Sequence, residues 1–258
     1  MRLMKRILSA AAVLALSASL LVGCSSGTAS SVPVSASSAA ESTVSSVEET
    51  ASSAVDENEA AAAQLLNDLT GSYQELWPVI LADEYKQTWP DDCTALVGED
   101  NAEAAFEKLS SMVTGDVYGE DAVKAYANGG GAYFCGFTNS LAILTFDGET
   151  STISGTDKDG NVLFSHTYHY IGMEPVRGLY EFQSDDADSG EFTYFFLAPD
   201  TSAETYHIEF RYGSDAEALS QYDTGEYAYW LASGISTDCD QTMIDNCIEL
   251  FCTENLAG

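Results

Sequence analysis

The second half of this chain is a series of short β-type runs separated by tight turns, and this pattern constrains the fold most strongly. Asp147-Gly148, Asp159-Gly160 and Ser189-Gly190 are typical turn sequences between such runs. The predicted strands are Tyr133–Phe137, Leu141–Phe146, Thr150–Gly155, Val162–Tyr170, Leu179–Phe182, Phe192–Leu197 and Thr205–Tyr212. Consecutive strands joined by tight turns pair antiparallel, and this many strands need closure or a second sheet to protect their edges.

Helical patterns flank the predicted strands on both sides. The predicted helices are Glu59–Leu69, Asn101–Met112 and Gly119–Ala127 before the strands, and Asp215–Gln221 and Asp240–Phe251 after them. The glycine triplet at 129–131 follows a helix and enters a strand, so it is expected to be a joint rather than a phosphate-binding loop. The sequence therefore predicts a mainly β fold with flanking helices (α+β).

The N-terminus has the order of a bacterial secretory signal. A basic start is followed by an apolar run from Ile7 to Val22, which is shorter than the ~20 residues that a spanning helix needs. Leu21-Val22-Gly23-Cys24 resembles a lipobox, and this resemblance implies cleavage before Cys24 and attachment of lipid to its thiol. Residues 1–23 are thus predicted to be a lipoprotein signal peptide, and the protein to be extracytoplasmic and lipid-anchored to the bacterial cell membrane. A plain signal peptide or a short anchor is the alternative.

Residues 24–59 form a Ser/Ala-rich segment without any aromatic side chain. Such a segment buries too little apolar area to offset the entropy lost on ordering, so we predict a flexible tether. All tryptophans, tyrosines and phenylalanines lie in residues 60–258, which are long enough for one domain with a full core. The chain carries a formal net charge of −32, and this excludes nucleic acid as an expected partner.

Five cysteines remain when Cys24 is set aside: Cys93, Cys135, Cys239, Cys247 and Cys252. Disulfides are permitted outside the cytoplasm, but an odd number leaves at least one thiol unpaired, and the connectivity is not readable from sequence. We expect buried thiols together with one or two structural bridges. Cys247 and Cys252 point about 140° apart on a helix, so they are not expected to bond to each other.

The histidines offer one candidate metal site. His166 and His169 are three residues apart in a strand, so their side chains should point to opposite faces. In the run from Thr205 to Tyr212, alternation places His207 and Glu209 on one face, together with Arg211. If that face turns toward the inside of the sheet structure, an imidazole and a carboxylate could bind one divalent cation with a third ligand from a neighbouring element. The alternative is a solvated polar face on which Glu209 pairs with Arg211.

Motifs of other function classes are weak. The Asp-rich turn around Gly160 lacks calcium ligands at the first and last loop positions, Gly155 and His166. There is no GxSxG elbow and no HExxH, and no histidine has a recognisable catalytic neighbourhood, so the protein is not expected to be an enzyme.

Several segments, taken in order, resemble the ZinT family of zinc-binding domains, from Leu69 to the C-terminus. The matching segments are Leu69-Thr-Gly71-Ser-Tyr-Gln-Glu-Leu-Trp77-Pro, Tyr168-His-Tyr170-Ile-Gly172, Arg177-Gly178-Leu-Tyr-Glu-Phe182, Tyr206-His207-Ile208 with Tyr212-Gly213-Ser-Asp-Ala-Glu-Ala-Leu219, and Tyr227-Ala-Tyr-Trp230. The resemblance implies a small antiparallel calycin-like β-barrel flanked by helices. It also implies a divalent metal, zinc or a zinc-like ion, and a role in metal acquisition with an importer component as partner.

The metal ligands of the family are only partly kept. His207 matches the second histidine of the family's "H-F-H" motif, whereas Thr205 stands at the first, and Asp200 lies near a third ligand histidine. The resemblance therefore implies a modified site of His207, Asp200 and Glu209. An imidazole with two carboxylates is a harder ligand set, on which zinc is less favoured over manganese or calcium.

A second hypothesis is a module that has lost metal and binds a small organic molecule or a partner protein. Its barrel mouth would then be lined by aromatic side chains such as Tyr206, Phe210, Tyr227, Tyr229 and Trp230.

Overall fold

The structure is a computed structural model of the 258-residue chain, and it describes residues 57–114, 133–198 and 207–256. The predicted signal peptide, Cys24, most of the predicted tether, the predicted helix Gly119–Ala127 and the candidate ligand Asp200 lie outside the described residues. No helix in the described ranges is long and apolar enough to span a bilayer.

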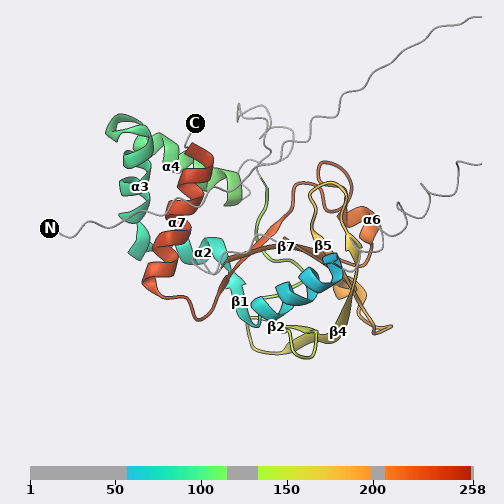
Figure 1. The fold of residues 1–258 in the computed structure, drawn as a ribbon. Helices are drawn as coiled ribbons and strands as arrows, with labels where there is room; N and C mark the ends of the chain where they lie inside the picture. The colour runs from blue at the N-terminus through green and yellow to red at the C-terminus, as the bar shows by residue number, and fades with distance from the viewer. Residues whose placement is uncertain (1–56, 115–132, 199–206, 257–258) are drawn as a thin grey trace, which may run out of the picture. The chain divides into compact units, whose positions relative to one another are not determined.

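The strands of the described chain form one closed antiparallel barrel (Figure 1). Each strand pairs with the next along the chain, and the last pairs with the first. The strands are β1 (Gly71–Glu75), β2 (Ile143–Asp147), β3 (Thr152–Thr156), β4 (Val162–Met173), β5 (Tyr180–Ser184), β6 (Tyr194–Leu197), β7 (His207–Gly213) and β8 (Ala232–Ser236). The predicted fold class, a small antiparallel barrel with flanking helices, is confirmed. Closure leaves no unpaired edge.

Two of the strands were not predicted from the sequence. β1 has the sequence GSYQE and β8 the sequence ASGIS, and neither shows a clear alternation of large apolar and polar residues. They become strands because they pair with each other and with their neighbours, which is a tertiary effect. The predicted strand Tyr133–Phe137, in contrast, contributes only a single parallel bridge between Phe134 and Trp230.

The helices lie before, between and after the strands. They are a helix over residues 57–68, α2 (Leu76–Ile80), α3 (Thr88–Val97), α4 (Glu99–Thr114), α6 (Ala216–Leu219) and α7 (Gln241–Leu256), with 3-10 turns η1 (Asp83–Tyr85) and η2 (Gly190–Phe192). The predicted helices around Asn101 and Asp240 are confirmed. α3 was missed, and it begins with Thr88-Trp89-Pro90, where proline is tolerated because it lies in the first turn.

The helix over residues 57–68 packs its apolar face on the barrel core. Ala62, Leu65 and Leu66 are buried in the same cluster as the inward-facing residues of the strands. A Cβ atom at Gly148 would lie 2.4 Å from the Cα of Asn67. The turn between β2 and β3 therefore needs glycine there, because the helix backbone passes directly beside it.

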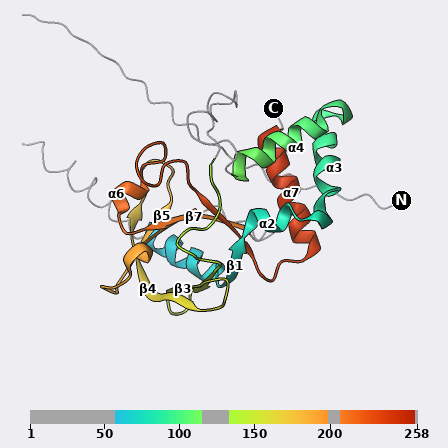
Figure 2. The same ribbon diagram turned by 180° about the vertical axis from the view of Figure 1, so that it is seen from behind.

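Helices α3, α4 and α7 pack together with α2 to form a second apolar cluster, here called the helical layer (Figures 1 and 2). Trp89 is 1% exposed and donates its indole N–H to the carbonyl of Ile80 at 2.7 Å. Its ring contacts Phe106 and Phe251. Ile235 of β8 is buried in this cluster, so the helical layer covers the outer wall of the barrel at β8.

The five cysteines of the described chain are free thiols, so the expected structural bridges are absent there. Cys93 of α3 and Cys252 of α7 are both buried, and their sulfur atoms are 4.0 Å apart. Burial raises the pKa of both thiols. Cys247 and Cys252 do not bond to each other, as the helical spacing predicts.

The environment of Asp92, on α3 near α7, disfavours its charged carboxylate. Its Oδ2 is buried without a hydrogen-bond partner in the described chain. Burial raises its pKa above 3.8, and the charges of Glu249, Asp245 and Asp91 add to this effect.

We expect Asp92→Asn to raise the free energy of unfolding by about 1 kcal/mol near neutral pH. A carboxyl group whose pKa is raised on folding destabilises the folded state when it is ionised but not when it is protonated. The gain from Asp92→Asn should therefore shrink as pH falls toward the ordinary value of 3.8. Urea denaturation at about pH 7 and about pH 4 measures this. Asp91→Asn is the control, because Asp91 is exposed and accepts a hydrogen bond from Gln87 at 2.9 Å. An equal gain in both variants would contradict the prediction.

Candidate functional site

The predicted metal ligands His207 and Glu209 lie on the outer face of β7. Ile208, Phe210 and Tyr212 alternate with them and are buried in the core inside the barrel. The predicted alternation is therefore confirmed, but the polar face turns outward, so the condition for a site inside the barrel is not met. The apolar face turns inward because burying it is favourable, whereas burying ionisable groups is costly.

On the outer face, the pair lies beside β8 and close to the helical layer. His207 is opposite Ile235 in the antiparallel register, and Glu209 is opposite Ser233. Both side chains are partly buried. The charge of Glu209 contributes, after burial, to raising the pKa of Cys135. This interaction indicates that the Glu209 carboxylate lies near the segment that leads into Gly136.

The described residues provide two of the three predicted ligands. Asp200, the third, lies outside them, in the connection between β6 and β7. Within the described ranges, no three His, Cys, Asp or Glu side chains gather closely enough to hold a metal ion. A three-ligand site with His207 and Glu209 therefore needs a donor from outside the described ranges.

The other two histidines form separate pairs with aspartates. His166 Nδ1 lies 2.8 Å from Asp186 Oδ2, and its side chain is 13% exposed. His169 Nδ1 lies 2.6 Å from Asp185 Oδ1, and its side chain is 51% exposed. The prediction that the two histidines point to opposite faces of β4 is confirmed by this difference in exposure.

The inside of the barrel is a packed aromatic core. Phe195 is fully buried, and its ring centroid lies 5.4 to 6.4 Å from those of Tyr168, Tyr212, Phe164 and Phe210. The Tyr212 hydroxyl accepts from the Thr138 backbone N–H at 2.7 Å and donates to the Thr138 carbonyl at 2.9 Å. Burial raises the pKa of Tyr212 to about 12. These rings fill space that a ligand would occupy in a hollow barrel.

The aromatic residues of the second hypothesis take part in packing. Phe210 belongs to the core, and Tyr206 lies outside the described residues. Trp230 contacts Tyr212 and Tyr227 and donates its indole N–H to the Gly136 carbonyl at 2.8 Å. The predicted aromatic lining of an open mouth is thus used, in large part, to hold the segment after α6 against the barrel.

Two arginines lie against the ring of Tyr222, and sequence reasoning did not single out this arrangement. The guanidinium carbon of Arg177 is 4.5 Å from the ring centroid and that of Arg211 is 4.3 Å from it. Arg177 is exposed and donates to the Tyr133 hydroxyl at 2.6 Å. Arg211 is fully buried, and its two terminal nitrogens donate to main-chain carbonyls rather than to the Glu209 that the sequence alternative paired with it, while its Nε has no partner in the described chain.

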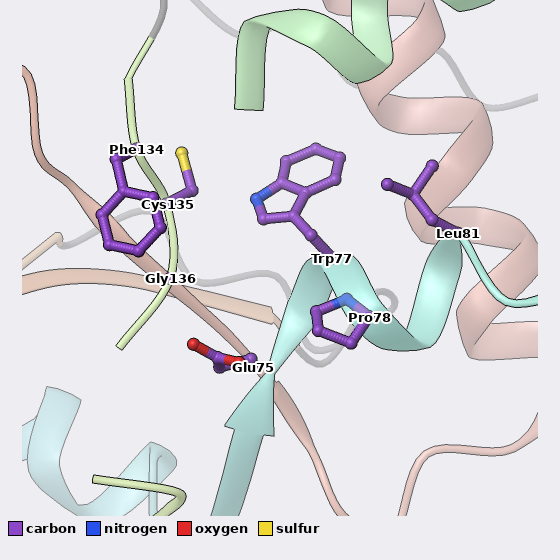
Figure 3. A pocket seen from close by; sticks show the side chains of 7 residues that line it. All are labelled: Glu75, Trp77, Pro78, Leu81, Phe134, Cys135 and Gly136. Atoms are coloured by element: carbon purple, nitrogen blue, oxygen red, sulfur yellow. The ribbon is translucent and has the colours of Figure 1, made fainter. Parts of the chain in front are cut away.

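A pocket of about 340 Å³ opens between the end of β1, α2 and the segment over residues 134–136 (Figure 3). We call it the Trp77 pocket. Its lining residues are Glu75, Trp77, Pro78, Leu81, Phe134, Cys135 and Gly136. Sequence reasoning missed it, because its two walls are more than fifty residues apart in the chain and no motif links them.

The Trp77 pocket is apolar except for a small number of polar groups. Glu75 Oε1 accepts the backbone N–H of Phe137 at 2.5 Å, which fixes the carboxylate at one side of the pocket. Burial raises the pKa of the Cys135 thiol to about 12, so it is protonated at neutral pH. The Trp77 indole N–H lies on the side of the ring toward Cys135 (Figure 3). It lowers the pKa of Cys135, so it lies near the sulfur, but it has no acceptor at hydrogen-bond geometry in the described chain.

Comparison with known proteins yields only remote structural neighbours. No family model matches the chain, and no curated protein does. The Zn(II)-bound ZinT-like domain of Streptococcus pneumoniae AdcA is similar over 71% of this chain and 89% of that domain, with 15% identity and a TM-score of 0.45. Zn(II)-bound AdcA from the same organism is similar over 72% of this chain and 35% of that protein, with 14% identity and a TM-score of 0.43.

Proposed function

We propose that this chain is a lipid-anchored extracytoplasmic binding protein whose cargo is a divalent cation. The observation that supports the proposal is the placement of His207 and Glu209 on one face of β7, two residues apart and partly buried. Asp200, in the connection that enters β7, is the proposed third ligand. The sequence order of the N-terminus, ending at Cys24, supports the anchor.

The proposed ligands suit a divalent ion. His207 would bind in its neutral form through one ring nitrogen, and Glu209 and Asp200 would bind as carboxylates. One nitrogen and two oxygen donors accept zinc or manganese more evenly than three imidazoles do. The net charge of −32 raises the concentration of cations around the protein, although this attraction is not specific to any site. A tethered cation-binding domain of this kind would supply an importer component in the same membrane.

Calorimetric titration of the full-length chain with zinc, and separately with manganese, tests the proposal. We expect saturable binding to the wild type and a loss of at least about tenfold in affinity in His207→Ala, since even residues that only support metal ligands change affinity by 10–100-fold. His169→Ala is the matched control, because His169 is exposed and pairs with Asp185. Equal affinities of the wild type and His207→Ala would remove His207 from the site.

Binding of a small organic molecule is the second candidate function. The observation that favours it is the Trp77 pocket, which lies outside the barrel rather than at its aromatic mouth.

A further inference from the structure

We infer that the Trp77 pocket is a binding site for a small aromatic amine. Its lining includes none of the proposed metal ligands, although Glu209 lies near Cys135 at its edge, and the inference does not depend on a bound metal. Its volume of about 340 Å³ lies at the lower end of the range of ligand pockets. Such a volume suits a single ring with a short side chain rather than a peptide or a lipid.

The apolar lining of the pocket favours a ligand that is itself mostly apolar. Trp77, Pro78, Leu81 and Phe134 supply most of the walls. Trp77 is 7% exposed and rigidly packed on Phe251, with ring centroids 4.7 Å apart, so this wall is preformed. Phe134 is 38% exposed, so the opposite wall can adjust to a ligand. One fixed and one adjustable aromatic wall favour stacking of a flat ring between them.

The charge of the lining selects for a cation. Glu75 is the one charged residue among the lining residues of the pocket. Its Oε1 already accepts the Phe137 N–H, which holds the carboxylate in place, and a carboxylate can accept several hydrogen bonds. An ammonium group placed there would form a charge-assisted hydrogen bond, and an anion would be repelled.

The Trp77 indole N–H adds a requirement for an acceptor. A buried N–H donor without a partner is costly, and this one lies at the side of the pocket toward Cys135. The protonated thiol of Cys135 is only a weak acceptor. The indole nitrogen is covered in this structure, so a hydroxyl or carbonyl oxygen on the ligand would satisfy the indole N–H only when the adjustable wall at Phe134 and Cys135 moves away from it. The structure therefore favours a ring that carries an amine at one end and an oxygen at the other.

Tyramine has these features, and its analogues each lack one of them. Phenethylamine lacks the hydroxyl, 4-ethylphenol lacks the amine, and 3-(4-hydroxyphenyl)propionate replaces the amine by a carboxylate. Titration of the full-length chain with each compound, in the presence of EDTA, separates this site from any bound cation. Tryptophan fluorescence reports binding beside Trp77, and calorimetry measures the affinity. We expect tyramine to bind most tightly and the carboxylate not to bind.

Two variants locate the site. Glu75→Gln keeps an oxygen that can accept the Phe137 N–H but removes the charge, so it should weaken tyramine at least about tenfold and leave 4-ethylphenol unchanged. Leu81→Trp fills the pocket and should abolish binding of both. Absence of saturable tyramine binding by the wild type would overturn the inference. Unchanged tyramine affinity in either variant would overturn it as well. None of these outcomes bears on zinc or manganese binding at His207.

Discussion

Arg211→Ala is expected to lower the free energy of unfolding by about 3 kcal/mol or more. Arg211 is fully buried, and its guanidinium donates to the carbonyls of Leu219, Gln221 and Tyr227. Removing it leaves these carbonyls without their donor and opens a cavity beneath Tyr222. Burial lowers the pKa of Arg211, because the charge has little water around it, and the carbonyls and the ring replace that water.

The matched control is Arg177→Ala. Arg177 lies over the same ring of Tyr222, at 4.5 Å, but its side chain is exposed. Loss of an exposed cation–π contact should cost about 0.5–1 kcal/mol. Arg211→Lys keeps the charge, but its donors all come from one nitrogen, which cannot reach the carbonyls that two guanidinium nitrogens span, so the stability lost should lie between the losses of the two alanine variants. Urea denaturation of all three variants measures the differences. If Arg211→Ala cost no more than Arg177→Ala, the buried arginine would not hold the segment after α6 in place.

The sequence predicted the elements whose own pattern is strong. β4 and β7 alternate apolar and polar residues over many positions, and the tight turns between the strands have typical turn sequences, so the antiparallel barrel followed from local signals. β1 and β8 lack such a pattern, and they become strands through pairing with β2 and β7 and with each other, where barrel closure places Gln74 opposite Ile235. A contact of this kind, across more than 150 residues, leaves no trace in either local sequence.

The candidate site was predicted only in part, for a related reason. Alternation correctly placed His207 and Glu209 on one face of β7, but it does not say which face is inside. The three apolar residues Ile208, Phe210 and Tyr212 decide that, because they join a core that the other strands build. The Trp77 pocket is still harder to foresee, since Glu75 and Phe134 lie far apart in the sequence and meet only in the folded structure.

The second large effect is expected at Phe195. Its ring is fully buried on β6 and contacts aromatic rings from β4 and β7. Phe195→Ala should lower the free energy of unfolding by about 3–5 kcal/mol, because the neighbouring rings are held by their own strands and cannot move in to fill the cavity. Phe195→Leu keeps much of the volume and should cost less than about half as much.

Phe134→Ala is the control for Phe195→Ala, because it removes the same atoms from a ring that is 38% exposed. Phe134→Ala should lower the free energy of unfolding by only about 1 kcal/mol, since much of that ring is already in contact with water. The two alanine variants, compared by urea denaturation, therefore test whether the barrel is filled by its aromatic rings or encloses adjustable space. A loss at Phe195 as small as that at Phe134 would mean that the interior can relax around a missing ring.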